Sequence, residues 1–362
     1  MSGMYVHIPF CESKCQYCAF ASFAGKNSEQ KRYFEKLKQE ILSSNFTFKV
    51  DGIFIGGGTP SAVDKNFIAE ILSAIKSKFE VSDKAEITIE ANPNSLDREK
   101  LEFYKSIGIN RLSIGVQSLD DAVLKKLGRL HSHAQVFDAL KEAKHAGFEN
   151  INCDLLLGLE NEMYNFLKKE VKLLKKYVTH FSCYMLQVEE NTHLEKMVLD
   201  GSVKLPSDEK TIENYAKLTK FLQKNGFFQY EISNFAKKGY KCQHNLNYWR
   251  RGNYLGFGLG AHSFMDEKRW ANGLTFEDYY KGRKSLEEKL TEGQIVEEVI
   301  MLGLRCEEGF DKQKLLEKGY DIEKNQNFQE LKKQQILFED GGKIKINPAY
   351  YGASNLVIER LI

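Results

Sequence analysis

The chain lacks several features that would place it in a special class of protein. Its 52 lysines and arginines face 50 aspartates and glutamates, and the net charge of +2 gives no overall field that would attract nucleic acid or an anionic membrane. It has no apolar run of about 18 residues, and therefore no candidate membrane span. It also has no internal repeat or low-complexity tract. With 42% hydrophobic and 28% charged residues, the composition predicts an ordinary soluble globular protein.

The chain also lacks a disulfide framework. Four of its seven cysteines are scattered singly, which fits a reducing compartment in which thiolates remain available to metals: Cys153, Cys183, Cys242 and Cys306. The first residues form an apolar, strand-like segment without the charged and apolar regions of a secretory leader. We therefore expect a cytoplasmic protein, with the inner face of the membrane as a site of peripheral association.

The other three cysteines lie within eight residues. Cys11, Cys15 and Cys18 form a C-x3-C-x2-C pattern that no fourth cysteine completes. Three such thiolates can ligate a [4Fe-4S] cluster and leave its fourth iron open for chemistry. A structural zinc site is the alternative, with His7 or a distant cysteine as fourth ligand, although zinc sites usually pair their cysteines as C-x2-C. Plain structural cysteines are a third interpretation, which would leave a loop prone to oxidation without a packing benefit.

Six short apolar segments, each followed by an amphipathic stretch with helical spacing, run through the first half of the chain. This alternation predicts parallel strands joined by right-handed crossovers. Six units fall short of a closed eight-unit barrel, so we predict an α/β fold with an incomplete (β/α)6 barrel. The predicted strands are Tyr5–Phe10, Gly52–Ile55, Glu86–Glu90, Arg111–Val116, Ile151–Leu157 and Phe181–Val188.

Unusual residues gather where the predicted strands end, which is where barrel active sites assemble. The cysteines follow the first strand and Gly56-Gly57-Gly58-Thr59-Pro60 follows the second. Glu90 closes the third strand, Gln117 follows the fourth, and Asp154 lies on the fifth. Glycines let a ligand approach the backbone and leave N–H groups free to bind it. A tight turn and a solvent-facing Glu90 are the plainer interpretations.

Taken in order, these motifs resemble those of the radical S-adenosylmethionine (SAM) superfamily and, within it, the anaerobic coproporphyrinogen III oxidase family. The resemblance covers most of the chain. One departure is Gly158-Leu159-Glu160, where the family usually has Gly-Leu-Pro. The segments that carry the resemblance are the cysteine motif, Gly56–Pro60, Glu90–Pro93, Gly108–Ser118, Gly128–His131, Asp154–Leu159, Tyr230–Ala236, Cys242–Trp249 and Gly256–Ser263.

The resemblance implies two cofactors and the residues that hold them. In this superfamily, SAM binds the open iron of a [4Fe-4S] cluster, and one electron cleaves it to a radical; the cofactors carry the chemistry and the protein positions them. The implied cluster ligands are Cys11, Cys15 and Cys18. The residues implied to contact SAM are Tyr5, Tyr17, Gly57, Gly58, Thr59, Glu90, Gln117, Arg129, Asp154 and Met185. Among these, Tyr17 would lie over the adenine.

Two further departures separate the branches of the family. The oxidase branch carries C-x3-C-x2-C-x-C and an N-terminal arm, whereas here Ala19-Phe20 follows Cys18 and only ten residues precede Cys11. Both departures favour the HemW-like branch of haem chaperones, which deliver haem to respiratory acceptor proteins. The alternative is oxygen-independent coproporphyrinogen III oxidase, which forms protoporphyrinogen IX by radical SAM oxidative decarboxylation.

The motif His244-Asn245-Leu246-Asn247-Tyr248-Trp249 supports the haem-chaperone interpretation. His244 offers a nitrogen beside flat aromatic side chains, which suits haem iron and its macrocycle. Without the resemblance, a lone histidine of this kind is more often a hydrogen-bonded structural residue. With it, we expect His244 to ligate haem. Cys242 is either an alternative thiolate ligand or a small buried side chain, and we expect His7 to pack beside the cluster loop.

The C-terminal part departs from the β/α rhythm. Helical stretches at Ile295–Leu304 and Phe328–Gln335 precede Ile336–Ile346, which is typical of a hairpin with a glycine turn. We predict a barrel at 1–200, an extension with the haem motif at 201–285, and a small winged-helix-like α+β domain at 286–362. The mixed charge of this domain favours a lid or docking role over DNA binding. The expected partners are haem, haem-acceptor proteins at the membrane surface, a reductant for the cluster and, as one allowed state, a second copy of the chain.

Overall fold

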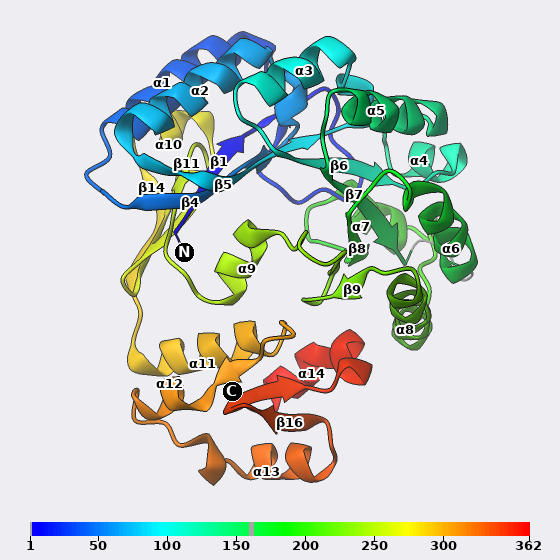
Figure 1. Cartoon of the computed structure of the whole chain (residues 1–362), viewed down its shortest axis with the longest axis vertical. Helices are drawn as coiled ribbons and strands as arrows, with labels where there is room; N and C mark the ends of the chain where they lie inside the picture. Colours follow the sequence, from blue (N-terminus) through cyan, green and yellow to red (C-terminus); the bar gives the residue numbers. More distant parts are fainter. Residues whose placement is uncertain (1, 159–162) are drawn as a thin grey trace.

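The computed structural model describes residues 2–158 and 163–362, and its main feature is a curved, open sheet of twelve strands (Figure 1). The strand order is β14-β13-β12-β11-β1-β4-β5-β6-β7-β8-β10-β9. Neighbours from β11 to β8 run parallel, and antiparallel strands extend both edges. The predicted incomplete barrel is confirmed. The unusual Leu159-Glu160 lies outside the described residues.

Six parallel strands match the six predicted β/α units: β1 Gly3–Ile8, β4 Lys49–Gly57, β5 Glu80–Ala91, β6 Arg111–Gln117, β7 Asn150–Leu157 and β8 His180–Met185. Several predicted bounds are wrong: β4 and β5 begin earlier than predicted, and two other differences have a local cause. The first strand ends before Pro9, which has no N–H for a ladder, and β2 (Phe10–Cys11) pairs separately with β3 (Phe23–Ala24). The sixth strand stops at Met185, because its neighbour β7 ends directly opposite.

Helices cover the outer face of the sheet (Figure 1). Several begin at side-chain caps of the kind that satisfies free helix N–H groups; Ser132 and Gln135, for example, form a capping box. The fourth β/α unit carries an additional short helix, α4 (Asp121–Lys126), before its longer helix. The helices of the first half that were predicted are α1 Gln30–Leu42, α2 Lys65–Lys78, α3 Arg98–Ser106, α5 His133–His145 and α6 Met163–Leu174.

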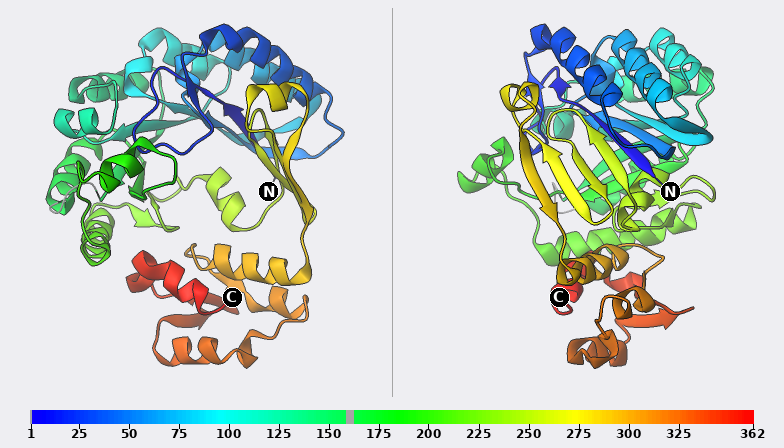
Figure 2. Two further views of the ribbon diagram at one scale, coloured as in Figure 1. Left: turned by 180° about the vertical axis from the view of Figure 1, so that it is seen from behind. Right: turned by 90° about the vertical axis from the view of Figure 1, so that its left-hand side faces the viewer.

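The middle of the chain extends the sheet at both edges. After α7 (His193–Leu199) and α8 (Asp208–Lys224), β9 (Phe228–Gln229) and β10 (Asn234–Ala236) add to the β8 edge. The chain then crosses to the other edge through α9 (Gln243–Trp249), which lies in the concavity of the sheet (Figures 1 and 2). The elements at that edge are β11 Tyr254–Phe257, β12 His262–Met265, β13 Lys268–Asn272, α10 Phe276–Tyr280 and β14 Lys284–Lys289.

The C-terminal part is a small α+β unit beneath the barrel, as the winged-helix-like prediction requires (Figure 1). Its strands form an antiparallel sheet of order β15-β17-β16. Gly341 and Gly342 both have positive φ, 59° and 80°, which a tight two-residue hairpin turn needs. Its elements are α11 Glu292–Gly303, β15 Phe310–Asp311, α12 Lys312–Leu316, α13 Gln326–Lys333, β16 Leu337–Asp340, β17 Lys343–Ile346 and α14 Ser354–Glu359. The proposed boundaries at 200 and 285 stay predictions.

In the described part of the chain, no helix combines the length and the apolar character needed to cross a membrane.

Candidate functional site

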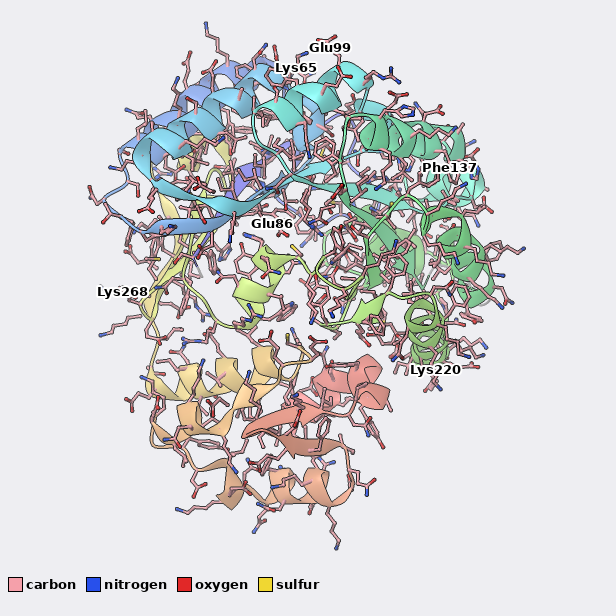
Figure 3. All side chains as sticks on the ribbon, viewed as in Figure 1. Lys65, Glu86, Glu99, Phe137, Lys220 and Lys268 are labelled. Atoms are coloured by element: carbon pink, nitrogen blue, oxygen red, sulfur yellow. The ribbon has the colours of Figure 1, made fainter. Side chains whose placement is uncertain are left out.

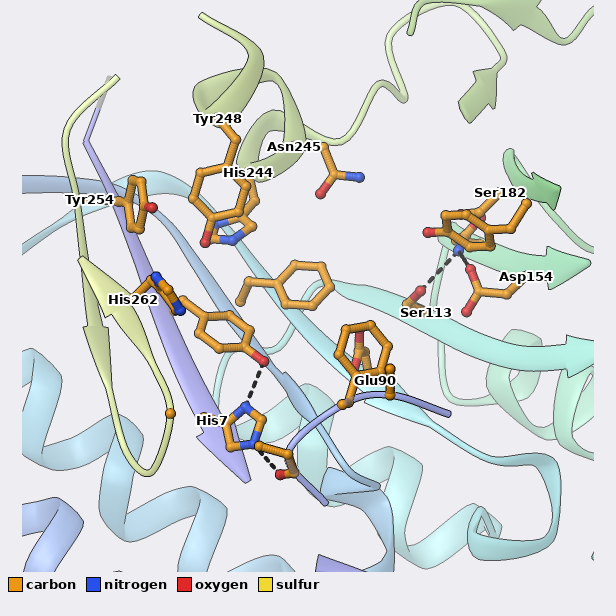
Figure 4. Close-up of a pocket in the computed structure, with 18 of the residues that line it drawn as sticks. His7, Glu90, Ser113, Asp154, Ser182, His244, Asn245, Tyr248, Tyr254 and His262 are labelled. Carbon is orange, nitrogen blue, oxygen red and sulfur yellow. Dashed lines mark hydrogen bonds between the residues drawn. The ribbon is translucent and has the colours of Figure 1, made fainter. Parts of the chain in front are cut away.

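The interior of the barrel holds a cavity of about 530 Å³ (Figure 4). Side chains from β1, β4, β5, β6, β7 and β8 line its wall, the loop after the cysteines contributes Ala19, Phe20 and Ala21, and α9 contributes His244 and Tyr248. Its volume is typical of cofactor sites. Residues from distant parts of the sequence therefore share one chamber.

Two carboxylates, Glu90 and Asp154, line the same wall of this cavity. Glu90 Oε2 accepts a hydrogen bond from Gly57 N at 2.9 Å, and Asp154 Oδ1 accepts one from Asn152 Nδ2 at 2.8 Å. Burial and the negative Asp154 raise the pKa of Glu90 to about 7, and burial also raises the pKa of Asp154. A ligand with positive charge and hydrogen-bond donors would relieve this repulsion, and the amino group and sulfonium of SAM fit that description.

The glycine turn after β4 does not leave its N–H groups free, so that expectation is wrong. Gly57 N donates to the Glu90 carboxylate, Gly58 N donates to Ile8 O at 2.8 Å, and Thr59 N donates to Phe10 O at 2.8 Å. These hydrogen bonds connect the end of β4 to the segment that leads into the cysteine loop. What it can still offer a ligand are carbonyl oxygens, which suit an amino group because an amino group donates hydrogen bonds.

Each of the three cysteine sulfurs has a polar neighbour. Thiolates bound to a cluster are stabilised by such neighbours, which also tune the potential of the cluster. Burial raises the pKa of the Cys11 thiol, while its contact with Thr59 lowers it. The contacts are Thr59 Oγ1 to Cys11 Sγ at 3.6 Å, Arg129 Nη1 to Cys15 Sγ at 3.4 Å, and Ser22 Oγ to Cys18 Sγ at 3.9 Å.

Within residues 2–158 and 163–362, no three His, Cys, Asp or Glu side chains converge closely enough to hold a single metal ion. A structural zinc site needs four ligands around one point, whereas a [4Fe-4S] cluster takes each cysteine at a different iron.

The structure sorts the predicted SAM residues into two groups. Tyr5, Glu90 and Asp154 line the cavity, whereas Gly57, Gly58, Thr59, Tyr17, Gln117, Arg129 and Met185 lie outside its lining. Arg129 contacts Cys15 and also donates from Nη2 to Asn92 Oδ1 and Gly115 O, both at 2.6 Å. Gln117 is buried at the end of β6 with a positive φ of 66°. Arg129 therefore belongs to the surroundings of the cysteines.

His7 packs beside the cysteine loop, as expected. Its Nε2 lies 2.8 Å from Ala21 O, and its Nδ1 lies 2.9 Å from the Tyr5 hydroxyl (Figure 4). Burial lowers its pKa. Because both ring nitrogens already have partners, His7 has no free nitrogen for a metal.

His244 differs from His7 in that neither of its ring nitrogens has a hydrogen-bond partner, although the side chain is only 4% exposed. The ring stacks on Phe54 at 4.8 Å and meets the edge of Tyr248 at 4.5 Å (Figure 4). Burial, and then the charge of Arg111, lower its pKa to about 3, so the imidazole is neutral. A buried polar group without a partner is costly, and here it lines a cavity. This is the pattern expected of a ligand-binding histidine.

Helix α9, which carries His244, is held at its first turn by Glu86 on β5, which lies above the helix in Figure 3. Glu86 Oε1 accepts hydrogen bonds from Gln243 N at 3.0 Å and from His244 N at 3.5 Å. Cys242 Sγ also lies 3.5 Å from this oxygen, and burial raises the pKa of its thiol to about 12. Of the two interpretations of Cys242, the small buried side chain is the one that the structure supports.

Polar residues on β6, β7 and β8 were missed as members of the site. They line the cavity or lie beneath it: Arg111, Ser113, Asn152, His180 and Ser182. A signal was present, because they alternate with apolar residues along buried parallel strands, whose two faces are usually both apolar. Period-two polarity in such strands indicates a polar barrel interior.

Comparison with known proteins places the chain in a family. The family model described as "Radical SAM superfamily" matches residues 5–174 of the chain. Over its whole length, the chain is 33% identical to "Heme chaperone HemW" of Lactococcus lactis, of which the match covers 97%. The chain belongs to the HemW family of radical SAM proteins. Membership of this superfamily implies a [4Fe-4S] cluster and SAM as cofactors.

Other comparisons agree with this HemW assignment. Identity to "Heme chaperone HemW" of Bacillus subtilis is 37%, covering 88% of this chain and 87% of that protein. Identity to "Radical S-adenosyl methionine domain-containing protein 1, mitochondrial" of Bos taurus is 33%, covering 86% and 75%. Among solved structures, coproporphyrinogen III oxidase (HemN) of Escherichia coli matches 99% of this chain and 89% of its own, with a TM-score of 0.85 and 20% identity. At that identity the likeness shows a shared fold.

Proposed function

We propose that this HemW-family protein is a haem chaperone. It binds haem in the barrel cavity with His244 as the iron ligand, holds a [4Fe-4S] cluster on Cys11, Cys15 and Cys18 beside SAM, and transfers the haem to an acceptor protein. The observation that carries the proposal is the buried, unpartnered imidazole of His244 in a cavity of about 530 Å³. The family name of the relatives supports the same function.

The surroundings of His244 suit a porphyrin. A neutral imidazole is the protonation state that binds iron, and the low pKa of His244 keeps it neutral at any physiological pH. Phe54, Tyr5 and Tyr248 surround the ring and give the cavity flat apolar surfaces at this end. The cost of leaving two ring nitrogens buried without partners is relieved when one of them binds iron.

The opposite end of the cavity suits SAM. Cys11, Cys15 and Cys18 would ligate the cluster, with Thr59, Arg129 and Ser22 donating to or touching the three sulfurs. When bound, the cluster supplies a single electron and an open iron site. Glu90 and Asp154 would accept hydrogen bonds from the amino and hydroxyl groups of SAM.

A haem titration tests the proposal directly. Wild-type protein and His244→Ala are titrated with haemin and followed by the Soret absorbance, with His131→Ala as a control. His131 is also buried and neutral, but its Nε2 lies 3.0 Å from Val116 O and it does not line the cavity. We expect His244→Ala to lose the Soret spectrum of ligated haem iron and to bind haemin at least tenfold more weakly. The control His131→Ala should keep the spectrum and the affinity of wild type. An unchanged spectrum and affinity in His244→Ala would exclude His244 as the ligand.

The competing function is oxygen-independent coproporphyrinogen III oxidase. The absent fourth cysteine argues against it. The test is protoporphyrinogen formation from coproporphyrinogen III by the anaerobically reconstituted protein with SAM and a reductant. We expect no turnover, and robust turnover would contradict the chaperone function.

Transfer also requires partners. We propose an acceptor protein that receives haem at the membrane surface and a reductant for the cluster, and self-association of the chain as one state of the carrier. Mixing haem-loaded protein with haem-free membranes and following the haem spectrum in each fraction tests the transfer step.

A further inference from the structure

A continuous chain of hydrogen bonds crosses the barrel from the SAM end of the cavity to the start of helix α9. It passes through side chains on β7 and β8 and through Tyr230, all of which are enclosed in the barrel. Figure 4 shows its Asp154 end, beside Ser113 and Ser182. The bonds are Asp154 Oδ1 to Asn152 Nδ2 at 2.8 Å, Asn152 Oδ1 to His180 Nδ1 at 2.6 Å, His180 Nε2 to the Tyr230 hydroxyl at 2.8 Å, and the Tyr230 hydroxyl to Cys242 N at 3.2 Å.

The direction of every bond in this chain is determined. The two amide hydrogens of Asn152 go to Asp154 and to Ser113 Oγ at 2.9 Å, so its Oδ1 must accept from His180 Nδ1–H. Burial lowers the pKa of His180 well below its ordinary value, so the ring is neutral and Nε2 is an acceptor. Tyr230 therefore donates its hydroxyl hydrogen to His180 and accepts from the Cys242 N–H. All the donors point toward the Asp154 carboxylate.

The series of hydrogen bonds ends at the N-terminus of helix α9, which carries His244. Cys242 precedes the first residue of α9, and the Tyr230 hydroxyl accepts its N–H just as Glu86 accepts the next two. The backbone of Tyr230 is fixed as well, since its carbonyl accepts from Glu307 N at 2.9 Å in the C-terminal unit. The Tyr230 hydroxyl is thus a fixed point against which the first turn of α9 is placed.

We propose that His180 and Tyr230 are positioning residues that couple SAM binding at Asp154 to haem binding at His244. The inference rests on the proposed function, because it assumes that both ligands bind. A charge-assisted bond to an ionised carboxylate is about twice as strong as a neutral one, and it strengthens the bonds behind it in the chain. SAM, with its donors and positive charge, favours the ionised form of Asp154. The whole array then holds the first turn of α9, and with it the His244 ring, more firmly.

The coupling appears as a ratio of binding constants. We expect saturating SAM to tighten haem binding by about fivefold, and haem to tighten SAM binding by the same factor, because such linkage is reciprocal. Haemin affinity is measured by absorbance on the anaerobically reconstituted protein without a reductant, so that SAM stays intact. SAM affinity is measured by calorimetry with and without haemin.

Tyr230→Phe removes the hydroxyl and keeps the ring. We expect the coupling factor to fall from about five to one, where the factor is the ratio of haem affinities that the variant itself shows with and without SAM. Tyr104→Phe is the matched control, because Tyr104 is also buried and its hydroxyl has no partner in the described part of the chain. The control should keep the full factor. A factor that survives in Tyr230→Phe would overturn the proposal.

A second pair of variants at His180 decides the matter if Tyr230→Phe does not fold. His180→Gln can still donate to Asn152 and accept from Tyr230, and it should retain the coupling, whereas His180→Phe should lose it. If wild type binds both haem and SAM but shows a factor of one, the coupling is wrong and the chaperone function stands. If wild type does not bind haem at all, the proposed function itself fails.

Discussion

At the scale of single residues, burial shifts the two kinds of titratable group in the cavity in opposite directions. It raises the pKa of Glu90 and lowers that of His244, because in both cases it disfavours the charged form. The cavity therefore holds a carboxyl group whose pKa lies near 7 and an imidazole that stays neutral. A folded protein tolerates the cost of burying these two groups when a bound ligand relieves it. The two pKa values can be measured in the ligand-free protein.

The raised pKa of Glu90 makes the SAM-free protein less stable as the pH rises. Its folded pKa of about 7 exceeds the ordinary 4.5, so between these values the folded state binds more protons than the unfolded state, and stability falls as pH increases through that window. Glu90→Gln keeps an acceptor for Gly57 N and removes the titration. We expect the free energy of unfolding in urea to rise by about 3 kcal/mol relative to wild type at pH 8, and by less than about 0.5 kcal/mol near pH 4.5. An equal difference at both pH values would contradict this assignment.

Arg129 is predicted to retain the cluster. It spans Cys15 Sγ, Asn92 Oδ1 and Gly115 O with a planar guanidinium that a lysine cannot reproduce. We expect Arg129→Lys to lose iron to a chelator about tenfold faster, as changes beside metal ligands commonly do. The loss of the cluster is measured by the iron content of the protein and by its absorbance near 400 nm. Arg98→Lys, at an exposed pair with Glu142, is the control and should behave as wild type.

At the scale of elements, the sequence predicted those that have a periodic signal. The six parallel strands and their helices follow from alternating apolar runs and amphipathic stretches, and the Gly341-Gly342 hairpin follows from its turn chemistry. The strands β9 to β14 were missed because β9 to β12 have only two to four residues each, and β13 and β14 carry charged residues without a regular apolar alternation. β11 contains Gly256 and is a strand only because it pairs with β1, with Tyr5 opposite Gly256. Pairing between segments about 250 residues apart leaves no local pattern.

The candidate site divides in the same way: residues in local motifs could be predicted from the sequence, and contacts between distant segments could not. Cys11, Glu90, Asp154 and His244 stood out in motifs, and the structure places the last three around one cavity. The structure also shows occupied N–H groups in the glycine turn, which the sequence could not reveal because their partners belong to β1, β2 and β5. Contacts between chain segments depend on register, and register is set by the whole sheet.

Helix α9 is predicted to depend on the Glu86 carboxylate for its position. Glu86→Ala removes the acceptor for Gln243 N and leaves the buried Arg111, which is 2% exposed, without its nearest carboxylate. We expect the free energy of unfolding to fall by about 3 kcal/mol in urea, and haem affinity to fall with it. Glu80→Ala, at the exposed start of the same strand, breaks only a surface pair with Lys49 and should cost less than about 1 kcal/mol. Equal costs in the two variants would exclude this role of Glu86.

At the scale of the whole molecule, the C-terminal unit docks beneath the barrel, next to the haem motif (Figures 1 and 2). Ile232 N donates to Arg305 O at 3.0 Å, and Glu307 N donates to Tyr230 O at 2.9 Å, so the backbone just before α9 is tied to this unit. Glu298 on α11 also forms ion pairs with Arg251 and Arg269, two arginines of the barrel part. The unit therefore supports the end of the cavity that contains His244.

Glu298 is predicted to be the main ionic link between the two parts. Its oxygens lie 2.7 Å from Arg251 Nε and 2.6 Å from Arg269 Nη1, and both it and Arg251 are largely buried. We expect Glu298→Ala to lower the free energy of unfolding by about 2 kcal/mol, between the values for exposed and buried pairs. Glu297→Ala, an exposed neighbour on the same helix, is the control and should change it by less than about 0.5 kcal/mol. A similar loss in both variants would mean that the helix and not the ion pairs is responsible.

The open sheet leaves two edges, and an unpaired edge is a template on which other chains can add strands and aggregate. Strand β9 at one edge has only two residues. Strand β14 at the other edge is Lys-Ser-Leu-Glu-Glu-Lys, and four of its six residues are exposed. Short length and dense charge of both signs are the means by which natural sheets discourage such pairing. The barrel can therefore stay open without becoming a seed for fibres.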